Sequence, residues 1–149
     1  SDWAPGKCTG RNVEPFDLQD HAETDYFMAE FPFKLAPREW LLRTQFVEDP
    51  KTKAIAALVK AVPDALPRNN CCYRLATFNS SWRLTPVENG ETEVEYILNT
   101  DEGLPYLLVN AVKPRATYKF FEDLPRLFGQ EQYRNAKPDA WKEYLLANQ

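Results

Sequence analysis

Residues 81–128 constrain the fold of this chain more than any other segment. Asn89-Gly90 lies between residues 81–87 and 91–99, which both read as β-strands. Asn-Gly is the strongest short-range signal for a hairpin, because both central residues of a type I′ turn need a positive φ angle. A short acidic loop follows, and residues 104–128 then have apolar positions at close to 3.6-residue spacing. The segment therefore predicts a strand, a tight turn, a second strand and a long helix.

The strand at 91–99 has the clearest two-residue period in the chain. One face of this strand would carry three acidic residues, Glu91, Glu93 and Glu95. The other face would carry Thr92, Val94, Tyr96 and Leu98. Successive side chains of a strand point to opposite faces of a sheet. We therefore predict that Val94, Tyr96 and Leu98 point inward. The glutamates are expected to form a solvated face rather than an acid/base pair.

Further strands are predicted upstream of this hairpin. They cover residues 13–19, 21–31, 38–48, 53–62 and 71–87, the last as one strand or as two interrupted at Asn79-Ser80. Pro15 places the first strand at an edge or in a bulge, because proline cannot donate to a ladder. Alanines within 53–62 also favour a helix, but turn signals on both sides favour a strand. A rigid bend at 31–37, a turn at 49–52 and a loop at 63–70 separate these strands.

Residues 1–12 are expected to be irregular, and residues 138–146 to form a short helix with Trp141 on one side. Pro114 lies inside the long apolar-periodic run. A proline there is expected to kink the helix or to mark its boundary.

Composition excludes several classes of function. A chain of 149 residues is expected to form one domain, and 44% hydrophobic residues are enough for a core. The net charge of −4 offers no basic field for nucleic acid. No apolar run reaches the roughly 20 residues of a membrane span. The sequence begins at Ser1 without a signal peptide. We therefore expect a processed or trimmed intracellular protein, cytoplasmic or organellar, with mitochondria included.

Cysteine and histidine usage argues against a metal site. The three cysteines are Cys8, Cys71 and Cys72, and the single histidine is His21. An odd count with one adjacent pair is not typical of a secreted disulfide framework. Cys71 and Cys72 lie in a predicted strand, where adjacent side chains point to opposite faces, so the two side chains are expected to diverge. A vicinal disulfide or a metal site is the alternative. Zinc needs more histidines or better-spaced cysteines, so we predict neither a metal nor another cofactor.

Several motifs, in order, resemble the START family of lipid-transfer domains related to the steroidogenic acute regulatory protein. The matching segments are residues 32–39, 73–74, 82–86, 90–94 and 101–110, and the resemblance covers residues 20–128. Arg38-Glu39 stands where the family has Arg-Asp, and one residue fewer separates Gly103 from Pro105. START domains are longer and have a further N-terminal helix and strand, for which this sequence shows no counterpart.

The resemblance implies an α+β helix-grip fold, in which a curved antiparallel sheet surrounds a long C-terminal helix. The START-like domain would cover residues 13–129, between the irregular residues 1–12 and a C-terminal extension at 130–149. It also implies non-covalent binding of a lipid, sterol or isoprenoid-like molecule in an apolar cavity. In this reading Arg43 binds a polar head group inside the cavity, and Tyr26 lies opposite. The other lining residues are Trp82, Leu84, Val94, Tyr96, Leu98, Leu108, Ala111 and Tyr118.

Plainer interpretations of the same residues remain open. Arg43 is alternatively an ordinary surface arginine, and the apolar strand residues alternatively pack under the helix without leaving a cavity. Arg38 is expected to anchor the bend through loop carbonyls, and Arg74 to pair with a carboxylate.

Three functions are compatible with these patterns. The first is non-catalytic binding or transfer of a lipid. The second is an accessory subunit that kept the fold, bound to a protein partner and with peripheral membrane contact. The third is a cyclase- or aromatase-like enzyme, although no catalytic residue stands out, because Ser80, Ser81 and Thr85 lack a nearby base.

Overall fold

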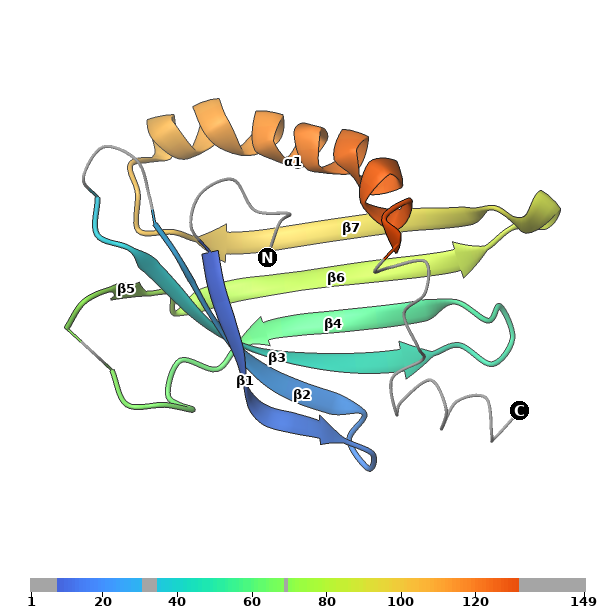
Figure 1. Ribbon diagram of the computed structural model, residues 1–149, viewed down its shortest axis with the longest axis horizontal. Helices are drawn as coiled ribbons and strands as arrows, with labels where there is room; N and C mark the ends of the chain where they lie inside the picture. The colour runs from blue at the N-terminus through green and yellow to red at the C-terminus, as the bar shows by residue number, and fades with distance from the viewer. Residues whose placement is uncertain (1–7, 31–34, 69, 132–149) are drawn as a thin grey trace. The chain divides into compact units, whose positions relative to one another are not determined.

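The computed structural model describes residues 8–30, 35–68 and 70–131, and the chain divides into two compact units, Ser1–Glu102 and Gly103–Gln149. The first unit is a seven-stranded sheet with strand order β1-β2-β3-β4-β6-β7, and β5 pairs with β3 outside this path (Figure 1). The strands are β1 (Cys8–Asp17), β2 (Ala22–Ala29), β3 (Arg38–Glu48), β4 (Ile55–Ala61), β5 (Tyr73–Arg74), β6 (Thr77–Pro86) and β7 (Thr92–Asp101). All neighbours are antiparallel except β3 and β5. Figure 1 also shows the sheet twisting strongly between β1 and β7.

Strand β1 begins earlier than predicted. Residues 8–12 were expected to be irregular, but they pair with β2. A Cβ atom on Gly10 would lie only 2.9 Å from the Phe27 ring, so the glycine permits close pairing of the two strands. The prediction of a bulged edge strand is confirmed, because β1 ends the strand order and its register shifts twice between Asn12 and Asp17.

The central strands agree with the sequence patterns. The strands β3 and β4 lie within the predicted ranges 38–48 and 53–62, and the helix alternative for 53–62 is wrong. The predicted turn at 49–52 is confirmed, since the Asp49 carboxylate accepts the Lys51 N–H at 2.9 Å. The predicted interruption at Asn79-Ser80 is wrong, because β6 is continuous there and the break lies between β5 and β6.

The hairpin between β6 and β7 turns where it was predicted. The φ angles of Asn89 and Gly90 are 73° and 76°, as the Asn-Gly signal requires. The turn is one residue longer than the two-residue form, since Glu88–Gly90 forms a single 3₁₀ turn. The Val87 N–H donates to the Glu91 carbonyl at 3.1 Å and closes the loop.

The second unit contains helix α1, Tyr106–Phe128, as the apolar periodicity predicted. Pro114 does not mark a boundary, because the helix continues through Pro114 and Pro125. The Gly129 N–H donates to the Pro125 carbonyl at 3.1 Å at the C-terminal end. No helix in the described ranges has the length and apolar character that a bilayer span requires. Residues 31–34 of the predicted bend and the predicted helix at 138–146 lie outside the described residues.

Candidate functional site

The unbroken register from β2 to β7 assigns each side chain to one face of the sheet. None of the ladders that join β2, β3, β4, β6 and β7 contains a register shift, so directly paired residues share a face. One face, which we name the aromatic face, has half-buried apolar residues on all five strands. Its large members are Phe27, Trp40, Leu42, Phe46, Val59, Phe78, Trp82, Tyr96 and Leu98.

Two aromatic groups lie on this face. Phe46 and Trp82 both pair with Ala57, and Trp82 pairs with Tyr96, whose ring centroid lies 4.2 Å from that of the indole. The second group is the Phe27–Trp40 pair of β2 and β3. Burial raises the pKa of the Tyr96 hydroxyl above its ordinary value. The aromatic face therefore offers contact area to a hydrophobic molecule.

Hydroxyl groups lie between these two aromatic groups. Ser80 pairs with Val59 and Leu98 and is buried, with 8% of its surface exposed. Thr100 lies two residues beyond Leu98 and pairs with Phe78. The Thr100 Oγ1 atom is buried and has no hydrogen-bond partner among the described residues. A buried hydroxyl without a partner costs about 1–3 kcal/mol, so an external acceptor or donor there would be favourable.

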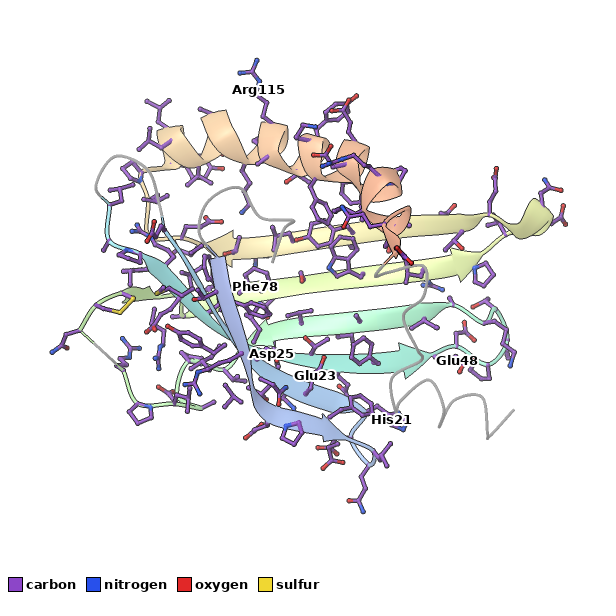
Figure 2. The ribbon with its side chains drawn as sticks, viewed as in Figure 1. His21, Glu23, Asp25, Glu48, Phe78 and Arg115 are labelled. Atoms are coloured by element: carbon purple, nitrogen blue, oxygen red, sulfur yellow. A yellow bond between two sulfur atoms is a disulfide. The ribbon has the colours of Figure 1, made fainter. Side chains whose placement is uncertain are left out.

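Acidic side chains occupy the same face toward one edge of the sheet. Glu23, Asp25 and Glu48 belong to the aromatic face by register, and Figure 2 labels them together with Phe78. The Asp25 carboxylate accepts the Asn12 side-chain amide at 3.0 Å, and Glu48 pairs with Lys53 at 3.8 Å. The sequence analysis missed these residues, although β2 alternates acidic positions with Thr24 and Tyr26. Their charge disfavours an anionic group near β2.

Arg43 does not lie on the aromatic face. It pairs with Thr24 and Lys60 and points to the other side of the sheet, which we name the Arg43 face. Its guanidinium is 2.9 Å from the Asp20 carboxylate and 3.6 Å from that of Glu14. The prediction that Arg43 shares a cavity with Trp82 and Tyr96 is therefore wrong.

A hollow beside that ion pair is lined mostly, but not entirely, by residues of the Arg43 face. A surface hollow of about 450 Å³ is lined by Asp20, Arg43, Gln45, Leu58, Val59, Lys60, Asn79 and Ser80. One carboxylate, that of Asp20, and the basic groups of Arg43 and Lys60 line this hollow, so its charge is mixed.

Tyr26 also lies on the Arg43 face, not opposite an arginine in a cavity. It pairs with Leu41, and its hydroxyl donates to Glu39 Oε2 at 3.0 Å. The other carboxylate oxygen of Glu39 accepts Arg74 Nε at 2.8 Å, and the Glu39 residue is fully buried. The prediction that Arg74 pairs with a carboxylate is confirmed. Tyr26 belongs to this buried structural network, which explains its place away from the aromatic face.

Arg38 anchors the chain as predicted. It is 4% exposed and donates to the Ala36 carbonyl at 2.6 Å and to the Glu102 carbonyl at 3.2 Å. Its guanidinium also lies 5.1 Å from the centroid of the Tyr73 ring. One arginine thereby connects the bend before β3, strand β5 and the end of β7.

The predicted parity of β7 holds for part of the strand. Tyr96 and Leu98 are half-buried, whereas Glu93 and Glu95 are exposed. Val94 and its partner Leu84 belong to the aromatic face by register but are 39% and 40% exposed. The covered part of the face therefore ends between Tyr96 and Val94.

The remaining predicted ligand-binding residues belong to helix α1. Leu108, Ala111 and Tyr118 are all exposed side chains of the second unit. Their part in a ligand site stays a prediction.

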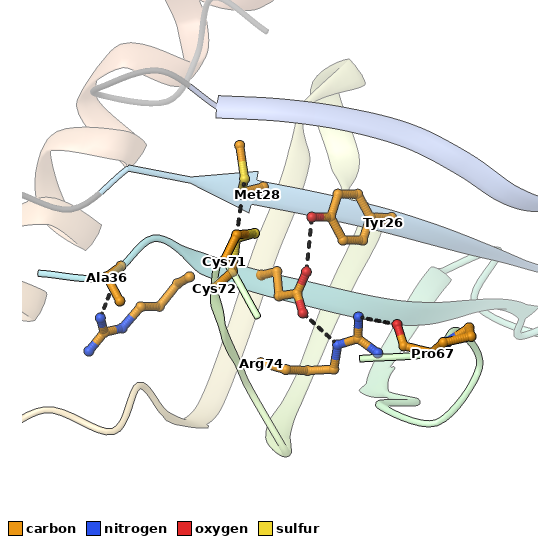
Figure 3. Close-up of a disulfide and its surroundings, with 9 residues drawn as sticks. Tyr26, Met28, Ala36, Pro67, Cys71, Cys72 and Arg74 are labelled. Carbon is orange, nitrogen blue, oxygen red and sulfur yellow. Dashed lines mark hydrogen bonds and ion pairs between the residues drawn. A yellow bond between two sulfur atoms is a disulfide. The ribbon is translucent and has the colours of Figure 1, made fainter. Parts of the chain in front are cut away.

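The adjacent cysteines form a disulfide, contrary to the expected divergence of their side chains. Residues 70–72 are bends that precede β5, so the opposite-face argument, which holds for strands, does not apply. Figure 3 shows the bridge beside Met28, whose Sδ lies 3.6 Å from Cys72 Sγ. Within residues 8–30, 35–68 and 70–131, no group of three His, Cys, Asp or Glu side chains is arranged to hold a metal ion.

Several solved structures have folds similar to that of this chain. A STAR-related lipid transfer protein from Xanthomonas axonopodis superimposes with a TM-score of 0.73 at 19% identity, over 87% of this chain and 71% of that one. Human STARD10 superimposes with a TM-score of 0.70 at 14% identity, over 97% of this chain and 60% of that one. No family model and no curated protein matches the sequence. The chain therefore has the START-like helix-grip fold, an open seven-stranded sheet followed by a C-terminal helix.

Proposed function

We propose that this chain binds a lipid or another largely hydrophobic small molecule, without catalysis, on its aromatic face. The observation that carries the proposal is the continuous half-buried apolar surface across β2, β3, β4, β6 and β7. Burial of apolar surface contributes about 25 cal/mol per Å², so one lipid tail on this surface gives useful affinity. The name of the similar Xanthomonas protein, a lipid transfer protein, agrees with this assignment.

The polar groups of the face favour a ligand with a neutral head. Thr100 Oγ1 has no partner among the described residues, and Ser80 is its neighbour in the next row of the face. A hydroxyl or carbonyl group on the ligand would satisfy that buried atom. Arg43 lies on the opposite face and cannot bind an anionic head there, while Glu23 and Asp25 would repel one. We therefore favour a sterol, an isoprenoid alcohol or a similar neutral lipid over a fatty acid.

Catalysis is not part of the proposal. A serine nucleophile needs a base within hydrogen-bond distance. No such base bonds to the Ser80 hydroxyl in the part of the chain that the structure describes. The groups on the aromatic face are suited to binding and orientation.

An accessory subunit is the second candidate. The strand order leaves β1 and β7 at its two ends, and Ile97 of β7 is 59% exposed. Open edges with apolar side chains are normally covered or blunted. A protein partner that pairs with β7 would cover this edge. If the partner is a second copy of the chain, sedimentation of the isolated chain at micromolar concentration detects the dimer.

Two adjacent residues of β7 supply the test of lipid binding. Leu98 lies on the aromatic face and Ile97 on the Arg43 face. A glutamate at position 98 places a charge among apolar side chains, whereas one at position 97 enters solvent. Leu98→Glu is expected to abolish retention of a fluorescent sterol, and Ile97→Glu to preserve it, with both folds checked by circular dichroism. Equal retention by both folded variants would refute the assignment of the aromatic face.

A further inference from the structure

The Cys71–Cys72 disulfide adds little to the stability of the fold. A disulfide stabilises a protein mainly by closing a loop in the unfolded chain, and this effect grows with the number of residues enclosed. Here the two cysteines are adjacent, so the loop is the smallest possible. A disulfide that stabilises a fold usually joins residues that are distant in the sequence. The position of this bridge therefore points to chemistry at the sulfurs.

The two cysteine residues differ in exposure. The Cys71 residue is exposed, whereas Cys72 is half-buried and its Sγ lies 3.6 Å from Met28 Sδ on β2 (Figure 3). Attack on a disulfide needs access of a thiolate to one sulfur along the bond that breaks. The more exposed residue, Cys71, is therefore expected to be the target, and Cys72 the leaving group.

A series of contacts connects the disulfide with Glu102, the last residue of the sheet unit. Tyr73 follows Cys72 directly, and its N–H donates to the Pro37 carbonyl at 2.8 Å. The Arg38 guanidinium lies 5.1 Å from the Tyr73 ring centroid and donates to the Glu102 carbonyl at 3.2 Å. Glu102 is the last residue before Gly103, whose φ angle is 61°. A change at the bridge therefore acts first on Tyr73 and through it on Arg38.

Arg74 limits how far such a change spreads. Its guanidinium donates to buried Glu39 at 2.8 Å and to the carbonyls of Pro63 at 2.9 Å, Leu66 at 2.5 Å and Pro67 at 3.1 Å. Beyond it, the Leu75 N–H donates to the Glu39 carbonyl at 3.0 Å. These contacts do not depend on the cysteines. Opening of the bridge is therefore expected to loosen residues 71–73 and to leave Leu75 in place.

We propose that Cys71–Cys72 is a reversible thiol–disulfide modification site, opened by an external dithiol, which controls the contact between Tyr73 and Arg38. A thiolate of the dithiol attacks Cys71 Sγ, a mixed disulfide forms, and Cys72 leaves as a thiolate. The second sulfur of the dithiol then attacks its own first sulfur and releases Cys71. The protein disulfide is reduced by two electrons, the dithiol is oxidised to its disulfide, and its two protons pass to the cysteine thiolates.

The test uses the whole chain, purified without reductant. Dithiothreitol treatment followed by iodoacetamide is expected to label both Cys71 and Cys72. Removal of the dithiothreitol and oxidation with excess oxidised glutathione before the alkylation is expected to prevent the labelling. Amide hydrogen exchange at Tyr73 is expected to rise about tenfold on reduction, while Leu75 keeps its protection. Cys8→Ser leaves the pair intact and should behave as the unmodified chain does.

The double variant Cys71→Ser/Cys72→Ser supplies a second measurement without reductant. It is expected to show the fast Tyr73 exchange permanently and to be insensitive to dithiothreitol. Failure of the dithiol to expose the two thiols would overturn the proposal. Exposure of both thiols without any change at Tyr73 would overturn it equally. If the double variant does not fold, exchange in the reduced unmodified chain decides.

Discussion

The Trp82 and Tyr96 rings face each other across the β6–β7 ladder, with their centroids 4.2 Å apart and their planes tilted by 33°. An aromatic pair of this kind contributes about 0.5–1.5 kcal/mol beyond the burial of its area. We expect Tyr96→Phe to keep the pair and to leave stability and lipid binding nearly unchanged. Tyr96→Ala is expected to lower the free energy of unfolding by about 2 kcal/mol and to weaken lipid binding. Urea unfolding and lipid titration, both followed by tryptophan fluorescence, check these outcomes.

The pair between Glu39 and Arg74 and the pair between Arg43 and Asp20 should differ greatly in importance. Glu39 and Arg74 are buried together, so Glu39→Gln leaves a buried charge unpaired and should cost about 3–5 kcal/mol. The pair between Arg43 and Asp20 is partly solvated, so Arg43→Leu should cost less than about 1 kcal/mol. Because Arg43 faces away from the aromatic face, Arg43→Leu should also retain lipid. Denaturant titration and lipid retention of both variants test the contrast, and a large loss of lipid from Arg43→Leu would contradict the face assignment.

The Thr100 hydroxyl has no hydrogen-bond partner among the described residues, so its removal should affect binding in a way that depends on the ligand. Thr100→Val replaces the hydroxyl by a methyl group of similar size. The variant without ligand is expected to be as stable as the original chain or about 1 kcal/mol more stable. Its affinity for a sterol alcohol is expected to fall about five- to tenfold, while its affinity for the matching sterol hydrocarbon stays unchanged. Equal losses for both ligands would show that Thr100 does not bind the ligand hydroxyl.

The Asp49 carboxylate should make the turn between β3 and β4 sensitive to acid. The hydrogen bond from the Lys51 N–H, followed by that from Thr52, lowers the pKa of Asp49 below its ordinary value of 3.8. A lowered pKa in the folded state means that the carboxylate stabilises the fold above about pH 3.8, and this contribution is lost as the pH falls through the lower folded value. Asp49→Ala should therefore be less stable than the unmodified chain at neutral pH. The difference should shrink well below pH 3.8, as urea unfolding at the two pH values would show.

Local chemistry made much of the sheet predictable from sequence. Two prolines and the Asp49-Pro50 turn enclose β3, so both ends of that strand were placed correctly. A tight hairpin turn needs positive φ angles at two consecutive residues, and Asn89 and Gly90 are residue types that adopt them readily. Strand β1 was placed too late, because Gly10 signals a break in sequence and its close approach to Phe27 exists only in the folded sheet.

The site was harder to predict, because membership of a face depends on register. A shift of one residue in the register moves a side chain to the other face of the sheet. The family resemblance placed Arg43 among the aromatic residues, but the register places the next residue, Thr44, on the aromatic face and Arg43 on the other face. Glu23 and Asp25 alternate with Thr24 and Tyr26, but the sequence does not show which strand pairs with β2. Their face could therefore be assigned only from the structure. The disulfide was only the alternative in the sequence analysis, because residues 71 and 72 were assigned to a strand, although they lie in bends before β5.

Native mass spectrometry tests the central claim most directly. The chain is incubated with vesicles of phosphatidylcholine that contain a sterol alcohol, re-isolated, and compared with its Leu98→Glu and Ile97→Glu variants. The account predicts one sterol bound to the unmodified chain and to Ile97→Glu, and none to Leu98→Glu. A folded, unmodified chain that carries no hydrophobic molecule, or one that carries the same molecule in all three forms, would contradict it.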